Sequence, residues 1–476
     1  MTALCDLPAL QLRAAIATRG ISPVELLDAC IERIELVDGA VNAMVTRAFD
    51  SARVQALAAE AAVRAGEPLG PLHGLPLGVK DLTATKGIRT TFGSALHADL
   101  VPAADEAVAA QVKASGALII GKTNTPEFGS GGNTRNDVFG ATGNPYDPDL
   151  TAGGSSGGSA AALATGMVPL ATGSDFGGSL RTPAAFCGIV GFRPSAGLIP
   201  EDTRVVGLSP FPVEGPMART VADAHLLLTG MVCHDAADPF SRPVDPALLA
   251  PLQAPDLGGL RLAYSADLGF AAVDPAVRTQ FARRMAVLGR HFRSASEATP
   301  NFADADEIFE TLRGTFMVAS YGQIPAARLG PNTRDNVARG RRLEVEGIAR
   351  AFARQTRLYR RFNDFFRDAD VLICPGASVA PFPHDRWYPA EVEGRPMPTY
   401  MTWLALTYGI TMAQGVVCAL PCGQDAQGLP FGLQVIGPSG ADRRVLEVAL
   451  ALEQAIAATP EFALPAPDLD LLRLRS

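Results

Sequence analysis

Long apolar runs, basic runs and regularly spaced cysteines are all missing from this chain. No apolar run reaches about 18 residues, so the sequence predicts no membrane-spanning helix and no membrane partner. Residues 1–12 lack a basic stretch followed by an apolar core, which predicts no signal peptide. The seven cysteines are scattered and odd in number, a pattern that disfavours a disulfide scaffold and favours the reducing cytoplasm.

Signals for nucleic-acid or metal binding are also missing. The net charge is −8 at pH 7, and basic residues form no run longer than a pair such as Arg341-Arg342, so no nucleic-acid partner is expected. Cys418 and Cys422 lie close together, but no second Cys or His pair is near them, so no metal site is expected. The six histidines form no compact motif, and each is interpreted as structural or exposed.

Lysine is scarce, and its few positions are clustered. Of the 41 Lys and Arg residues only four are lysine, which leaves 41 − 4 = 37 arginines. Arginine cannot lose its proton in a protein, whereas a desolvated lysine can. A position that has lysine instead of arginine is therefore a candidate for an amine that can lose its proton. Chance and local packing are alternative explanations for each of the four. The four lysines are Lys80, Lys86, Lys113 and Lys122.

Short apolar runs alternate with helical periods along the chain. Residues 22–25, Ser-Pro-Val-Glu, form a capping box with Pro at the first helical position, ahead of an amphipathic run over 26–36. The alternation predicts a layered α/β fold. Further expected helices cover residues 49–65, 107–115, 160–165 and 445–457, and expected strands cover 75–79, 118–120, 168–172, 371–374 and 429–437.

Residues 240–370 differ in character from the rest. They are richer in charge and in long helical patterns, for example over 343–366. We interpret them as a helical region around the sheet, because the chain shows no internal repeat and no clear domain linker.

Two serines flanked by glycines, Ser155 and Ser179, stand 24 positions apart (179 − 155). Residues 153–159 read Gly-Gly-Ser-Ser-Gly-Gly-Ser, and residues 174–181 read Ser-Asp-Phe-Gly-Gly-Ser-Leu-Arg. Glycine lets a backbone turn tightly and point its N–H groups at a ligand, and a serine beside such groups suits acyl transfer. A flexible linker is the alternative, but an Ala-rich helical run over 160–164 follows at once and disfavours it.

Two common motifs do not explain these serines. Residues 154–158 match G-x-S-x-G, but a nucleophile elbow must follow a strand directly, and a loop at residues 144–148 precedes the match. A P-loop is excluded because no Gly-Lys-Ser/Thr follows the glycines. A base other than histidine is therefore needed, and Lys80, at the end of an apolar strand, is the natural candidate.

With Lys80 included, the chain strongly resembles the amidase signature family over nearly its whole length. The match is most specific between residues 70 and 225, where both the order and the spacing of the motifs fit. The segments that carry it are Val79-Lys80-Asp81-Leu82, residues 121–128, residues 153–159, Gly177-Gly178-Ser179, residues 183–188, residues 215–223 and residues 428–434.

The resemblance implies a Ser–cisSer–Lys triad with Ser179 as nucleophile, Ser155 as bridging serine and Lys80 as base. It also implies a cis peptide bond between Gly154 and Ser155. Lysine has an ordinary pKa near 10.4 and a useful base needs roughly 7 to 8, a shift that burial can supply. The resemblance further implies an oxyanion hole from the backbone N–H groups of Asp175, Phe176, Gly177 and Gly178.

The family also implies a fold, a domain plan and a pocket. The expected fold is an α/β/α sandwich with a large, twisted, mostly parallel mixed sheet covered by helices on both faces. One domain is expected over residues 1–476, with a signature core at about 70–225 and a variable, more helical substrate side at about 240–420. Gly131, Gly132 and Asn133 lie where relatives line the acyl pocket. No cofactor is implied, and a homodimer is possible.

Several neighbours of the triad have a structural interpretation. Asp175 and Arg181 could contact substrate, but holding the loop is favoured. Lys122 is expected to pack its stem beneath the loop, and Ser156 to support the hydrogen-bond network. Cys187 is interpreted as a small buried residue and not as a second nucleophile.

The chain departs from the family pattern at two places, and these affect the expected function. Residues 411–416, Thr-Met-Ala-Gln-Gly-Val, replace an Asn-Leu-x-Gly-x-Pro stretch, and residues 347–352 lack the Tyr-rich helix of tRNA amidotransferase subunits. A free-standing hydrolase of small linear carboxamides is therefore favoured. The alternatives are a glutaminase (A-type) subunit of a tRNA-dependent amidotransferase and a non-catalytic binding relative.

Overall fold

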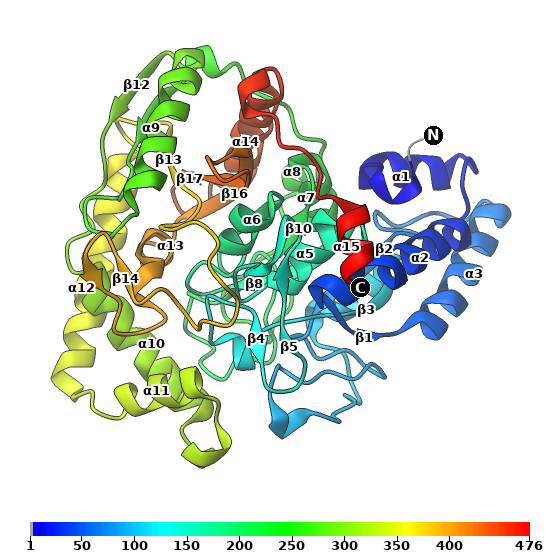
Figure 1. Cartoon of the computed structure of the whole chain (residues 1–476), viewed down its shortest axis with the longest axis horizontal. Helices are drawn as coiled ribbons and strands as arrows, with labels where there is room; N and C mark the ends of the chain where they lie inside the picture. Colours follow the sequence, from blue (N-terminus) through cyan, green and yellow to red (C-terminus); the bar gives the residue numbers. More distant parts are fainter. Residues whose placement is uncertain (1–2) are drawn as a thin grey trace.

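A mixed sheet forms the centre of the molecule (Figure 1). The computed structural model describes residues 3–476. In these residues the main sheet has 11 strands. In order across the sheet they are β1 (Met44–Arg47), β3 (Leu118–Thr123), β2 (Pro76–Lys80), β8 (Leu170–Asp175), β10 (Val213–Ala218), β9 (Val190–Arg193), β16 (Val416–Gln424), β17 (Pro430–Gly437), β13 (Val371–Pro375), β11 (Arg261–Tyr264) and β12 (Ser294–Glu297).

The mixed α/β/α sandwich is confirmed, but its strands are not mostly parallel. The pairs β3–β2, β2–β8, β13–β11 and β11–β12 are parallel. The pairs β1–β3, β8–β10, β10–β9, β9–β16, β16–β17 and β17–β13 are antiparallel. Parallel pairing therefore lies in two separate groups of strands, and the middle of the sheet is antiparallel.

Helices cover the sheet on both faces. Helices α5 and α6 pack on the strands around β8 to β17 and on each other, while α7 and α14 pack together on the same strands. The helices of the described chain are α1 (Ala9–Ala17), α2 (Pro23–Val41), α3 (Phe49–Ala65), α4 (Ala107–Ala114), α5 (Gly157–Ala164), α6 (Arg181–Cys187), α7 (Val221–Met231), α8 (Pro246–Leu249), α9 (Pro275–Leu288), α10 (Ala305–Tyr321), α11 (Pro331–Gly340), α12 (Val345–Phe365), α13 (Ala405–Met412), α14 (Asp442–Ala457) and α15 (Leu469–Arg475).

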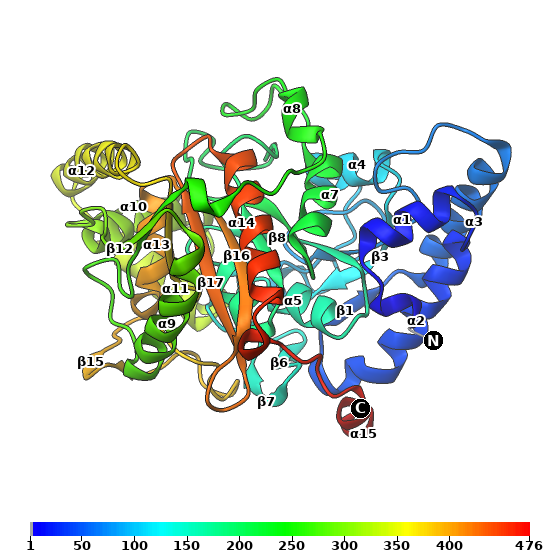
Figure 2. The ribbon, with the colours of Figure 1, turned by 90° about the horizontal axis from the view of Figure 1, so that it is seen from above.

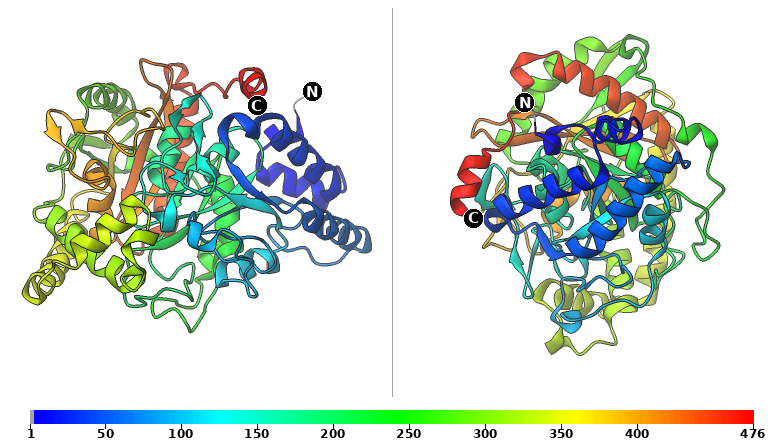
Figure 3. Two further views of the ribbon diagram at one scale, coloured as in Figure 1. Left: turned by 60° about the horizontal axis from the view of Figure 1, so that its bottom comes forward. Right: turned by 90° about the vertical axis from the view of Figure 1, so that its right-hand side faces the viewer.

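The two ends of the sheet carry different helices (Figures 2 and 3). Helices α1–α3 lie beyond β1, and α10–α12 lie at the opposite end (blue and yellow-green in Figure 3). Helix α10 packs against α11, α12 and α13. Three short two-stranded ribbons complete the fold: β4 (Arg135–Asn136) with β5 (Gly140–Ala141), β6 (Gly143–Asn144) with β7 (Asp147–Thr151), and β14 (Glu391–Val392) with β15 (Arg395–Pro396).

The capping box forms as expected. The backbone N–H of Glu25 donates to Ser22 Oγ at 3.0 Å, and the Ser22 N–H donates to Glu25 Oε2 at 2.7 Å. These two bonds satisfy donors that the first turn of a helix otherwise leaves free, so α2 begins at Pro23. Helix α3 covers residues 49–65, the range predicted from its apolar pattern.

Residues 240–370 are helical as predicted, but they also supply two strands. Strands β11 and β12 pair in parallel and extend the sheet beyond β13. Strand β12 reads Ser-Ala-Ser-Glu and is exposed at every position, so it has no apolar alternation to reveal it.

One connected set of buried apolar side chains extends from Cys5 to Leu472. Among residues 3–476, no helix combines the length and apolar character needed to cross a bilayer. The assignment of the chain to one domain stays a prediction.

Candidate active site

Lys80 ends strand β2 and lies among three hydroxyl groups. Its Nζ atom is 2.7 Å from Ser155 Oγ, 2.8 Å from Ser156 Oγ and 3.0 Å from Ser174 Oγ. The side chain is fully buried. The apolar strand Pro76–Lys80 carries the amine into the interior, and the loop before α5 brings Ser155 and Ser156 to meet it.

The surroundings of Lys80 favour the neutral amine. Burial lowers the pKa of Lys80 to about 7, although the Glu214 and Asp175 carboxylates oppose that shift. The physical cause is desolvation, which disfavours the charged form of a buried lysine. A neutral amine next to a hydroxyl is a general base at physiological pH.

Ser155 and Ser179 line the same cavity, whose volume is about 270 Å³. The Gly154–Ser155 peptide is cis, as the resemblance implied. The Ser156 N–H donates to the Ser179 carbonyl oxygen at 3.3 Å, which ties the two serine loops together. Ser174, Asp175 and Phe176 line the cavity as well.

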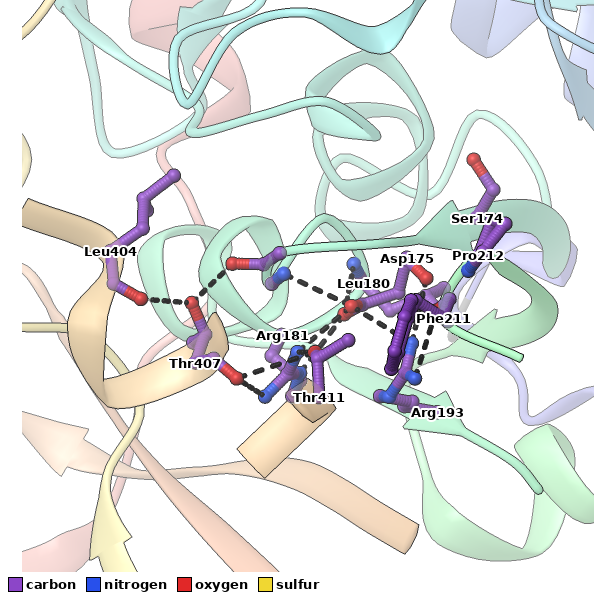
Figure 4. A network of polar contacts seen from close by, with 12 residues as sticks. Ser174, Asp175, Leu180, Arg181, Arg193, Phe211, Pro212, Leu404, Thr407 and Thr411 are labelled. Carbon is purple, nitrogen blue, oxygen red and sulfur yellow. Dashed lines mark hydrogen bonds and ion pairs between the residues drawn. The ribbon is translucent and has the colours of Figure 1, made fainter. Parts of the chain in front are cut away.

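Asp175 holds the loop that carries Ser179 (Figure 4). Its carboxylate accepts from Arg181 Nε at 2.9 Å and Nη2 at 2.8 Å, and Arg193 Nη1 lies 3.3 Å away. Burial raises the pKa of Asp175, but Arg181 and Arg193 outweigh it and hold the pKa well below its usual range. The carboxylate also accepts from the N–H groups of Gly178 at 3.0 Å and Leu180 at 3.1 Å.

The other side of this loop packs on α13. Arg181 Nη1 donates to the Thr407 carbonyl at 2.8 Å, and its Nη2 donates to Thr411 Oγ1 at 2.9 Å. Thr407 Oγ1 donates to the Gly177 carbonyl. Gly178 has φ +124° and a Cβ there would collide with Thr407, so only glycine fits at this position.

Comparisons with known proteins decide the family. The family model described as Amidase matches residues 25–446. The chain is 35% identical to an acylamidase of Rhodococcus erythropolis over 456 residues, covering 94% of this chain and 95% of the relative.

The chain belongs to the amidase signature family.

Other relatives agree on the family and differ in activity. The chain is 35% identical to the A-type subunit of a glutamyl-tRNA(Gln) amidotransferase from Picosynechococcus over 467 residues, covering 92% of this chain and 95% of that one. The structure of a bacterial aryl acylamidase of the amidase signature family superposes with a TM-score of 0.88 at 28% identity, covering 97% of this chain and 99% of the other. This amidase is thus a hydrolase that acts on linear amides.

The predicted oxyanion donors differ in their hydrogen bonding. The Gly178 N–H is engaged by Asp175, and Asp175 itself lies within strand β8. Among residues 3–476, no hydrogen bond is found from the N–H groups of Phe176 and Gly177. Among the four predicted donors, these two N–H groups have no acceptor within the described residues.

Gly131, Gly132 and Asn133 are not among the residues that line the cavity of Ser155 and Ser179. Gly129, two residues before Gly131, does line this cavity. A Cβ at Gly129 would lie 3.4 Å from Ser155 Oγ. The Asn133 amide donates to the carbonyls of His384 at 3.0 Å and Arg386 at 2.6 Å, so its side chain fastens another loop. That Gly131, Gly132 and Asn133 line the acyl pocket stays a prediction.

The contacts of the neighbours agree with structural roles, except for the place of Lys122. Asp175 and Arg181 hold the loop that carries Ser179, and Ser156 joins the hydrogen-bond network around Lys80. Lys122 is buried, but it donates to the Thr83 carbonyl and to Thr85 Oγ1 in the loop that follows β2, and not beneath the loop of Ser179. Cys187 is buried, and burial raises the pKa of its thiol, which disfavours the nucleophilic thiolate.

Sequence reasoning missed two groups at the cavity. Ser174 stands next to Asp175, and only the pairing of β2 with β8 brings it to Lys80. Glu214 faces Ser174 across the β8–β10 pair and lines the same cavity. Burial raises the pKa of Glu214, and Glu201 raises it further. An acidic residue just before the Gly-Pro-Met segment, next to a strand end, was the available signal for Glu214.

Proposed function

We propose that this amidase hydrolyses linear carboxamides through an acyl-serine intermediate, with Ser179 as nucleophile, Ser155 as proton relay and Lys80 as base. The observation that carries the proposal is the contact of the buried Lys80 amine with Ser155, whose hydroxyl is 2.7 Å away. Ser155 and Ser179 line the same cavity. A serine needs an activating base within hydrogen-bond reach, and the contact of Lys80 with Ser155 supports Lys80 as that base, acting on Ser179 through Ser155.

In the proposed acylation step, neutral Lys80 takes the proton of Ser155, and Ser155 takes the proton of Ser179. Ser179 Oγ then bonds to the amide carbon, and the oxyanion accepts from the N–H groups of Phe176 and Gly177. Collapse breaks the C–N bond, and the proton returns through Ser155 to the leaving nitrogen.

In the proposed deacylation step, water attacks from the side that the leaving amine has vacated. Water bonds to the acyl carbon and gives its proton to the Ser155–Lys80 pair. Breakage of the ester bond then releases the acid, and the proton returns to Ser179 Oγ. The sum is amide plus water giving acid plus ammonia or amine.

The cavity favours an amide with an aromatic or other flat apolar group. Phe128, Phe316 and Tyr321 line it together with Phe176, and Phe128 and Tyr321 stack at 4.5 Å. Such walls bind an aryl ring by apolar contact and edge-to-face packing. Two similar proteins are named acylamidase and aryl acylamidase, which supports anilides as the first substrates to test.

Replacing the nucleophile tests this proposal. Ser179→Ala is expected to lower kcat on acetanilide and butyranilide by at least about 10⁴-fold, because the covalent route is lost. Labelling by a fluorophosphonate probe should also be lost. The matched control is Ser320→Ala, which changes another cavity serine that has no part in the proposed chemistry. Ser179→Ala protein that kept wild-type turnover would refute the triad.

A glutaminase component of a tRNA-dependent amidotransferase is the second candidate, because several relatives of similar identity carry that name. It predicts ammonia release from glutamine that rises when partner subunits are added. If the purified chain hydrolyses anilides alone and leaves glutamine intact, the amidase proposal stands and this one does not.

A further inference from the structure

Arg313 projects from α10 into the wall of the catalytic cavity. It is only 6% exposed and lines the cavity with Ser155 and Ser179. Phe316 and Met317 follow it by three and four positions and line the same wall, as expected for one face of a helix.

The partners of Arg313 are all uncharged. Its Nη2 donates to Tyr400 Oη at 2.7 Å, and its Nε donates to Asn336 Oδ1 at 3.3 Å. Its Cζ lies 4.9 Å from the centre of the Phe176 ring. Among residues 3–476, no carboxylate lies within 4.0 Å of this guanidinium. Burial of a charge without a counterion is costly, so the position calls for a ligand that supplies one.

Other buried arginines of this chain are satisfied in a different way. Arg181 and Arg193 pair with the Asp175 carboxylate. Arg284 has no ion pair, but it donates to the carbonyl oxygens of Cys422, Gln424 and Gln280 and to the Gln280 side chain. Arg313 has neither a counterion nor a full set of carbonyls, and of these four arginines it is the one that lines the cavity of Ser179.

The acidic residues of the cavity do not neutralise Arg313. Glu201 pairs with Arg204 at 2.8 Å, and Asp202 accepts from the Ala107 N–H at 3.0 Å. Burial raises the pKa of Glu214, and burial likewise raises the pKa of Glu106 to about 7. Both shifts lower the share of ionised carboxylate near neutral pH without abolishing it, so Glu214 and Glu106 repel an anionic ligand less than free carboxylates would.

We propose that Arg313 binds a carboxylate of the amide substrate, so that this amidase prefers linear amides which carry a carboxylate near the scissile bond. A guanidinium presents parallel N–H groups that fit a carboxylate. Arg313 Cζ lies over the ring of Phe176, three residues before Ser179, so a carboxylate bound by this guanidinium would lie close to the loop that carries Ser179. This inference rests on the proposed amidase function.

Two matched substrate pairs test the inference and the side of the amide that bears the charge. The acyl pair is the monoanilide of succinic acid against butyranilide, and the amine pair is 4-acetamidobenzoate against acetanilide. In one of the two pairs, wild-type protein is expected to have a higher kcat/KM for the acid than for its neutral partner. Arg313→Gln is expected to lower the acid-to-neutral ratio of kcat/KM in that pair by about 100-fold, mainly through KM. Arg313→Lys should restore part of the ratio.

The control is Arg341→Gln, which removes one positive charge at an exposed position where Arg341 donates to the Gly322 carbonyl. Its acid-to-neutral ratio should stay within about twofold of wild type, because exposed charges are screened by salt. An Arg313→Gln ratio equal to wild type, or no preference for either acid in wild type, would overturn the inference.

Binding to intact protein covers the case in which Arg313→Gln fails to fold. Calorimetry on Ser179→Ala, which keeps Arg313, is expected to give a lower Kd for the preferred acid than for its neutral partner by about 10-fold or more. Equal Kd values would overturn the inference. Failure of wild type on every anilide would instead count against the proposed function, whereas hydrolysis of the neutral anilides without acid preference would remove only the role of Arg313.

Discussion

At the scale of single residues, the site depends on one buried amine. Four lysines remain in a chain that otherwise uses arginine, and two of them, Lys80 and Lys122, are fully buried near the ends of paired strands. Only Lys80 contacts a hydroxyl that lines the catalytic cavity. Burial is common to both lysines, so the contact with Ser155 is what distinguishes Lys80, the proposed base, from Lys122.

The pH dependence of kcat/KM should report Lys80. Because desolvation lowers its pKa to about 7, the base form is complete above that pH and is lost as pH falls. At pH 6 the rate should be about one tenth of the plateau. Glu214→Gln removes a carboxylate that raises the pKa of Lys80, so the acid limb should move to lower pH. The rate of pre-steady-state acylation of butyranilide, followed from pH 5 to 9, measures the acid limb of wild type and that of Glu214→Gln.

Glu310→Gln is the control for that change, since Glu310 is an exposed acid on α10 that does not line the catalytic cavity. Its acid limb should coincide with wild type. A Glu214→Gln profile shifted to higher pH would contradict the assigned interaction.

At the scale of elements, three segments meet through Asp175. Strand β8 ends on it, α6 supplies Arg181, and α13 receives the same guanidinium through Thr407 and Thr411. Thr411 begins the stretch that departs from the family pattern, so that departure occurs where α13 contacts the nucleophile loop.

Asp175→Asn should therefore damage stability as well as rate. It leaves Arg181 and Arg193 buried with no carboxylate, which is expected to lower the free energy of unfolding by about 3–5 kcal/mol. The Gly178 and Leu180 N–H groups would lose an anionic acceptor, so kcat should also fall. Urea unfolding measures the first effect. Asp149→Asn, whose partner Arg475 is exposed, should change stability by less than about 1 kcal/mol, and a similarly small change in Asp175→Asn would contradict the argument.

Elements with local signals could be predicted from the sequence, and those without could not. The capping box of α2 and the apolar period of α3 lie within their own residues, and both predictions are confirmed. Strand β12 exists because β11 offers it a partner, and its exposed Ser-Ala-Ser-Glu carries no signal. Lys80, Ser155 and Ser179 stand in recognisable motifs, whereas Arg313 reaches the cavity only through the packing of α10, which local patterns do not encode.

At the scale of the whole molecule, some stabilising contacts lie away from the cavity. The cavity lies among β8, β10 and α10, whereas α15 packs against α2 and supplies no residue to the cavity (Figures 1 and 2). Leu472 of α15 is fully buried, and its neighbour Leu471 is 41% exposed.

Leu472→Ala should therefore lower stability and leave catalysis intact. Loss of a buried leucine is expected to cost about 2–4 kcal/mol, because apolar contacts are lost and a cavity remains. Since α15 contributes no residue to the catalytic cavity, kcat/KM measured well below the Tm should stay within about twofold of wild type. Leu471→Ala is the adjacent control and should leave the Tm nearly unchanged. A Leu472→Ala protein with wild-type Tm would contradict the stability argument. A folded Leu472→Ala protein with kcat/KM reduced tenfold would show that α15 is coupled to the active site.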